Sequence, residues 1–129
     1  MKNILFILFI IISLDAKVYF YERDKKVYLK KDNTKVSTKR VKYFRNSKNE
    51  LVIVKNQIIL KLNSVAAITK YILKYNLEIK KKFNNKKYIF TIPNVDDVFW
   101  ISKELYNKTA VNYAYPVYVV KKQKKQPKQ

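Results

Sequence analysis

Acidic side chains are the main candidates for acid–base chemistry in this chain, because it contains no histidine and no cysteine. Without an imidazole or a thiol, Ser-His-Asp and Cys-His catalysis, disulfides and most zinc sites are excluded. Among the 9 Asp and Glu residues, Asp96 and Asp97 are adjacent. Neighbouring residues on a helix point in different directions, so this pair predicts a helix start rather than a general acid and base. We therefore expect a non-catalytic protein with no cofactor and no metal site.

The charge of the chain is strongly positive. Lys and Arg number 29 against 9 Asp and Glu, which gives a net charge of +20. Such a field favours polyanions and acidic surfaces as partners. Lys, Asn, Ile, Tyr and Phe are enriched together while Gly is absent, so a compositional bias spread over the whole chain also accounts for the charge.

The first sixteen residues predict a secretory signal peptide. Lys2 precedes an unbroken apolar run over residues 4–12, and "LDA" leads to a cleavage site between Ala16 and Lys17. The run is shorter than the roughly 20 residues of a membrane span. We expect a periplasmic or secreted protein that meets a membrane only through an uncleaved signal segment or weak electrostatic contact. Export also argues against a nucleic-acid partner.

After the signal, residues 17–50 are expected to form a β-hairpin extension. Residues 18–21 and 27–29 are apolar and flank the polar run 22–26. A hairpin is too small to be stable alone. Residues 51–120 are expected to form the main domain, and residues 121–129 a flexible basic tail.

In the main domain, apolar residues repeat first with period two and then with period three to four. "QIILKL" predicts a strand with Ile58, Leu60 and Leu62 on one face. The stripe that follows predicts a helix that ends at Asn76 in a left-handed conformation: Val65, Ile68, Ile72 and Tyr75.

A hairpin and a second helix are expected next. The two strands carry Leu77, Ile79 and Phe83, then Tyr88, Phe90 and Ile92, around a turn at Asn84 and Asn85. Asn94, with Asp97 three residues later, is similar to a capping box. The helix stripe is Val95, Val98, Ile101 and Leu105, with Trp100 partly exposed, and a final strand follows Thr109.

The resulting order, β-α-β-β-α-β, predicts an α+β fold with a ferredoxin-like, four-stranded antiparallel sheet and both helices on one face. The opposite face is expected to carry Ile59, Lys61, Ile89, Thr91, Ala114 and Tyr118. A soluble monomer tends to cover such a mixed apolar surface. Either the N-terminal hairpin folds over it or an external partner does.

Three segments resemble the N-terminal prodomain of bacterial subtilisin-like serine endopeptidases. "VKNQIILKLN" (residues 54–63) is similar to the first strand of that prodomain, and "LEIKKKFNNKKYIFTIP" (residues 77–93) to its central hairpin. "AVNYAYPVYVV" (residues 110–120) is similar to its last strand, with the aromatic-Ala-x-Pro turn. "YFYERDKKVYLKKDNTKVS" resembles the extension that precedes such prodomains in some bacterial members.

The resemblance implies an inhibitor and folding chaperone that binds a subtilisin-like catalytic domain. In such prodomains the helix-free sheet face packs on the protease, and the following residues lie in the substrate cleft. The residues implied at the sheet contact are Tyr113, Ala114, Tyr115, Pro116 and Val117. The residues implied to lead into the cleft are Tyr118, Val119 and Val120.

Two features depart from that family. Residues 111–118 contain no acid, and Tyr115 stands where Glu is common in the family. No catalytic domain follows in this sequence, so we expect a free-standing inhibitor, the first part of a split or truncated protease, or a prodomain whose protease is encoded separately.

Two other classes of function are compatible with parts of the sequence. A secreted binding module could attach to anionic lipid or cell-surface polymer through the lysines of the strand predicted at residues 77–83 and the tail lysines Lys121, Lys122, Lys124, Lys125 and Lys128. Single-stranded nucleic-acid binding needs exposed rings on adjacent strands. Tyr88 and Phe90 are instead predicted to face the core.

Overall fold

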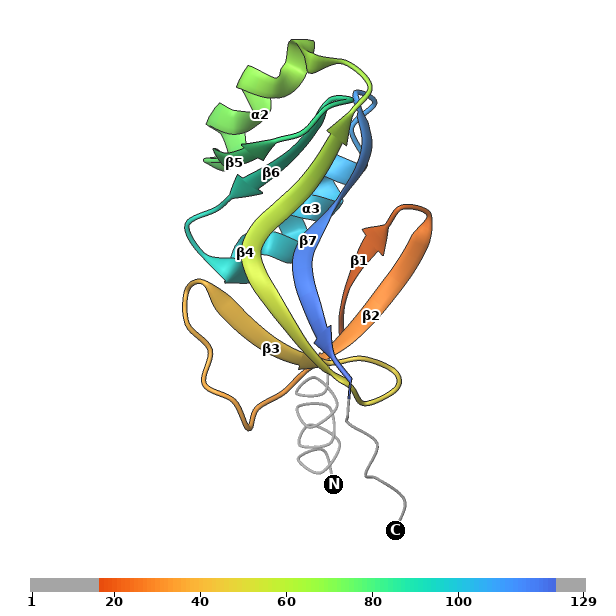
Figure 1. The fold of residues 1–129 in the computed structure, drawn as a ribbon, viewed down its shortest axis with the longest axis vertical. Helices are drawn as coiled ribbons and strands as arrows, with labels where there is room; N and C mark the ends of the chain where they lie inside the picture. Colours follow the sequence, from red (N-terminus) through yellow and green to blue (C-terminus); the bar gives the residue numbers. More distant parts are fainter. Residues whose placement is uncertain (1–16, 123–129) are drawn as a thin grey trace, which may run out of the picture.

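The computed structural model describes residues 17–122, which form an antiparallel α+β fold (Figure 1). The predicted signal peptide, including Ala16, and most of the predicted tail lie outside the described residues. The strands are β1 (Val18–Glu22), β2 (Lys25–Lys31), β3 (Val41–Arg45), β4 (Leu51–Leu62), β5 (Glu78–Lys82), β6 (Lys87–Thr91) and β7 (Val111–Lys121). The helices are α2 (Ile68–Tyr75) and α3 (Val98–Tyr106), each preceded by a short 3₁₀ turn. No helix among residues 17–122 is long and apolar enough to cross a membrane.

Strand β4 organises the sheet. One edge of β4 pairs with β7 along nearly its whole length. The other edge pairs first with β3, up to Lys55, and then with β6, from Gln57 onward. The sheet therefore runs in the order β1-β2-β3-β4-β6-β5, with β7 on the far side of β4. A strand was expected from Gln57, but it begins at Leu51 because the earlier residues pair with β3.

The N-terminal hairpin is not a separate extension. The sheet has seven strands rather than the predicted four, because β2 pairs with β3 and β3 pairs with β4. Phe20 and Phe44 are buried in the same core as α3, with ring centroids 6.2 Å and 5.2 Å from that of Phe99. One hydrophobic core thus joins residues 17–50 to residues 51–120.

Most predicted core faces are confirmed. The buried residues include the predicted faces of two strands and the stripe of the second helix: Ile58, Leu60, Leu62, Tyr88, Phe90, Ile92, Val95, Val98, Ile101 and Leu105. Trp100 is 49% exposed, as expected. Asn94 begins the second helical segment, where its Oδ1 accepts from the Asp96 amide at 2.9 Å. The predicted capping-box role of Asp97 is wrong, because its carboxylate accepts from Trp100 Nε1 at 2.9 Å.

The first helix and β5 depart from prediction. Val65 lies in a 3₁₀ turn rather than in α2 and is 47% exposed, while Tyr71 is buried instead. Ile79 is 48% exposed, next to a register shift between Ile79 and Lys81. A bulge interrupts the alternation of side chains, so the period-two reading of β5 failed there.

Asparagine supplies much of the left-handed backbone that glycine usually provides. Asn76 ends α2 with φ 54°, as predicted, and Asn85 has φ 64° in the β5–β6 turn. Asn tolerates this region better than most residues, because its short polar side chain bonds locally. Asn49 also has a positive φ, of 59°, whereas Arg23 and Lys86 adopt this region without an asparagine side chain.

Asp32 makes the stability of the β2–β3 connection depend on pH. Its buried carboxylate accepts from the Thr34 hydroxyl at 2.6 Å, the Thr34 amide at 2.9 Å and Arg45 Nε at 3.0 Å. These bonds, those from Thr34 first, lower the pKa of Asp32. The stabilisation is present above the ordinary carboxyl pKa of about 3.9 and is lost as pH falls through the lowered value.

We expect Asp32→Asn to be less stable than the wild type at pH 7. Its melting temperature should also fall less between pH 5 and pH 2, because the variant has no charge to lose. Thermal unfolding followed by circular dichroism across this range checks the prediction. Melting curves that shift in parallel for the two proteins would contradict it.

Candidate protein-binding surface

One face of the sheet formed by β5, β6, β4 and β7 carries no helix. The alternate residues of these strands point away from the core, and their strand registers place them in adjacent rows. We call them the helix-free surface: Gln57, Ile59, Lys61, Lys81, Lys87, Ile89, Thr91, Tyr113 and Tyr115. On the other side, α3 packs behind β4 and β7 (Figure 1). The ring centroids of Tyr75 on α2 and Trp100 on α3 are 6.1 Å apart.

The centre of the helix-free surface is apolar and aromatic. Ile59 lies between Ile89 on β6 and Tyr115 on β7, and the rings of Tyr113 and Tyr115 are 5.6 Å apart. All four side chains are half-buried within the chain itself. Burial, followed by the charge of Glu22, raises the pKa of Tyr115, so its hydroxyl stays neutral well past pH 7.

Only alternate members of the predicted contact set face this side. Tyr113, Tyr115, Val117 and Val119 alternate with Ala114, Pro116, Tyr118 and Val120, which lie on the core side of β7. The prediction that Ala114 and Tyr118 belong to the helix-free face is therefore wrong. A register shift beside Lys61 and Leu62 puts both Val111 and Ala114 in the core, so alternation counted from Val111 gives the wrong face.

The end of β7 is also not a free segment. Tyr118, Val119 and Val120 were expected to lead into a cleft, but they pair with Val54, Ile53 and Val52 of β4. The Tyr118 ring lies 5.5 Å from that of Phe20, and its hydroxyl donates to Glu22 at 2.7 Å. Burial and the Glu22 hydrogen bond raise the pKa of Tyr118. A segment that enters a cleft without disturbing β7 must therefore come after Lys121.

The N-terminal hairpin lies beside the helix-free surface rather than across it. Tyr21 of β1 stacks on Tyr106 of α3, with ring centroids 4.8 Å apart and planes 12° apart. Figure 1 shows the hairpin next to β7, away from β5 and β6. At its tip, the Arg23 guanidinium lies 6.0 Å from the centre of the Tyr113 ring. The hairpin thus borders the surface at β7 and leaves the part over β4 and β6 open to a partner.

Most charges around the apolar centre are cationic, and the Glu22 carboxylate near Tyr115 is an exception at the β7 border. Lys61, Lys81 and Lys87 extend from β4, β5 and β6 on this side, and Arg23 adds a charge at the β7 border. Cations at the rim of an interface favour a partner with acidic groups at the matching positions.

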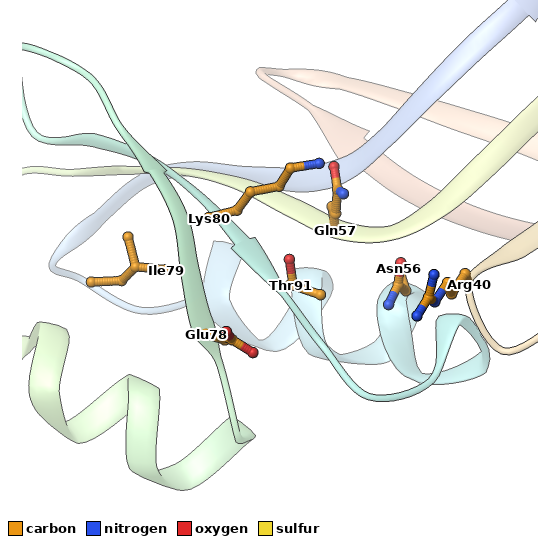
Figure 2. Close-up of a pocket in the computed structure, with 7 residues that line it drawn as sticks. All are labelled: Arg40, Asn56, Gln57, Glu78, Ile79, Lys80 and Thr91. Atoms are coloured by element: carbon orange, nitrogen blue, oxygen red, sulfur yellow. The ribbon is translucent and has the colours of Figure 1, made fainter.

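A polar hollow of about 360 Å³ continues the helix-free surface where β3 and β6 diverge from β4 (Figure 2). Its lining residues are Arg40, Asn56, Gln57, Glu78, Ile79, Lys80 and Thr91. Asn56 connects two of the lining segments. Its backbone N–H donates to Arg40 O at 2.9 Å, and its side-chain Nδ2 donates to Ile92 O at 2.8 Å. We refer to this cavity as the Arg40 hollow. No local sequence pattern predicted it, because its walls come from separate strands and from the β2–β3 connection.

The adjacent acids have structural roles. Asp96 pairs with Lys42 at 2.8 Å, and Asp97 accepts from the Trp100 indole. Within residues 17–122, no cluster of three acidic side chains suited to a metal ion is found. Asp96 and Asp97 therefore make separate contacts within the fold.

No family model, curated protein or solved structure matches this chain. The role of the helix-free surface must therefore be inferred from its own geometry and chemistry.

Proposed function

We propose that this chain is a non-catalytic, exported protein that binds a subtilisin-like serine protease through the helix-free surface and inhibits it. The observation that carries the proposal is a solvent-facing cluster of Ile59, Ile89, Tyr113 and Tyr115, on the side of the sheet opposite the helices. Aromatic residues in an apolar centre with a charged rim are typical of protein interfaces.

The strand arrangement supports the resemblance to a prodomain. β4, α2, β5, β6, α3 and β7 follow one another as β-α-β-β-α-β, and their strands lie in the order β7-β4-β6-β5. This strand order supports a ferredoxin-like arrangement of these six elements within the larger seven-stranded sheet, which also contains β1, β2 and β3. The segments that resemble the prodomain lie in β4, β5–β6 and β7, so they are neighbours in the sheet.

The mode of inhibition differs from the one the resemblance first implied. Docking of the helix-free surface would supply the affinity, and only residues after Lys121 could reach the cleft without breaking β7. The same docking supports a role as folding chaperone, because binding stabilises the folded state of the protease. At a free concentration of this chain 100 times its dissociation constant, the stabilisation is about 2.7 kcal/mol.

We expect the chain from Lys17 to Gln129, titrated into a subtilisin-like protease, to reduce peptide hydrolysis at micromolar concentration or below. Inhibition should persist when salt rises from 50 to 200 mM, because an apolar contact is screened much less than an ionic one. Full protease activity with micromolar chain would count against the proposal.

Binding to anionic lipid or cell-surface polymer is the second candidate. The observation in its favour is the edge strand β5, whose residues are all exposed and which carries Lys80, Lys81 and Lys82 in succession. Purely ionic binding should fall steeply between 50 and 200 mM salt, as binding to polyanions does. Sedimentation with anionic vesicles at these two salt concentrations separates this function from protease inhibition.

A further inference from the structure

The Arg40 hollow forms because β4 changes partner. From Leu51 to Lys55 the strand pairs with β3, and from Gln57 onward it pairs with β6. The start of β3 and the end of β6 separate at this point, and the opening between them exposes polar side chains of four chain segments, the β2–β3 connection, β4, β5 and β6 (Figure 2). A second hollow of about 420 Å³ adjoins the first and shares Arg40, Asn56, Glu78 and Thr91 with it.

The donors of the hollow outnumber its acceptors. Arg40 and Lys80 carry positive charges on different segments, and Gln57 and Thr91 add neutral polar groups between them. Asn56 is held in place by its bond to Ile92 O. Glu78 is the only acid among the described residues that line this hollow.

We propose that the Arg40 hollow binds a carboxylate carried by a peptide segment. The planar guanidinium fork of Arg40 matches a carboxylate in two parallel hydrogen bonds. The amides and hydroxyl around it suit the N–H and C=O groups of a peptide chain. Glu78 offsets one of the two positive charges, so a single carboxylate is enough to neutralise the charged groups of the lining. The carboxylate belongs to an acidic side chain or to a peptide C-terminus.

Nuclear magnetic resonance titration of the ¹⁵N-labelled chain from Lys17 to Gln129, which contains every described residue, tests the proposal. One probe is an N-acetylated, C-amidated alanine–serine hexapeptide with a single Glu, and a second has Gln in place of Glu. A third has no Glu and a free C-terminal carboxylate. We expect the Glu peptide or the free-carboxylate peptide to shift the amide signals of Asn56, Gln57 and Thr91. The Gln peptide should bind at least about tenfold more weakly than the carboxylate peptide that binds, the scale of a charge-assisted hydrogen bond.

Variants that remove either a positive or a negative charge from the lining make the test specific to the hollow. Arg40→Gln should weaken binding about tenfold or more, whereas Lys35→Gln, which removes the same charge from an exposed position of the β2–β3 connection, should leave it nearly unchanged. Glu78→Gln should tighten binding about twofold, and Glu104→Gln on α3 should not.

Three results would overturn the proposal. They are no binding of either carboxylate peptide, binding of the Gln peptide as tight as that of both carboxylate peptides, and equal losses in the Arg40 and Lys35 variants. The peptides report on the hollow alone, so a failure here is distinguishable from a failure of protease inhibition.

Discussion

Replacement of Phe20 by alanine is expected to lower the free energy of unfolding by about 3–5 kcal/mol, the usual cost of removing a buried phenylalanine side chain. Phe20 is fully buried, between Phe99 of α3 and Tyr118 of β7. Its loss should destabilise the whole chain and not only the hairpin, because one core joins both parts. Urea unfolding followed by circular dichroism and by tyrosine fluorescence measures the effect.

Tyr28→Ala is the matched control for Phe20→Ala. Tyr28 lies on β2 of the same hairpin, but it is 50% exposed on the outer side. We expect a loss of about 1 kcal/mol or less, in line with most substitutions at exposed positions. If Phe20→Ala instead unfolded the hairpin alone, in a separate transition at low urea, the shared core would be refuted.

Replacement of Ile59 by aspartate is expected to weaken protease inhibition by about thirtyfold or more, the scale of a central interface residue worth about 2 kcal/mol. The variant places a charge in the middle of the apolar centre, between Ile89 and Tyr115. Ile59 is only half-buried in the free chain, so the fold should survive. Inhibition constants and urea unfolding, measured on the same preparation, separate lost binding from lost folding.

Leu73→Asp is the control for Ile59→Asp. Leu73 is 78% exposed on α2, which lies off the helix-free surface. The same change there should leave the inhibition constant within about twofold of the wild type. Equal losses in the two variants would mean that binding does not depend on the helix-free surface.

Local signals in the sequence predicted the strands and helices around the main core. Period-two and period-three-to-four patterns placed Phe90 and Leu105 in the core, and both are 0% exposed. Asn76 was predicted to end the first helix in a left-handed conformation, and it has φ 54°. These features depend on a few neighbouring residues, which a local pattern records.

Features that depend on pairing between distant segments could not be predicted from the pattern. The partner switch of β4 near Lys55 is set by β3 and β6, whose positions no local pattern encodes. The register shift near Leu62 turns Ala114 toward the core, although simple alternation points it outward. The Arg40 hollow was missed for the same reason, since its residues come from separate strands and a connection.

Labelling of single cysteines in the complex tests the central claim most directly, because the natural chain contains no cysteine. Ile89→Cys places a thiol on the helix-free surface, and Leu73→Cys places one on α2. With a saturating subtilisin-like protease inactivated at its catalytic serine, we predict that maleimide labelling of the cysteine at position 89 slows at least about tenfold and that at position 73 does not change. Unchanged labelling at position 89 in a formed complex would contradict docking through the helix-free surface.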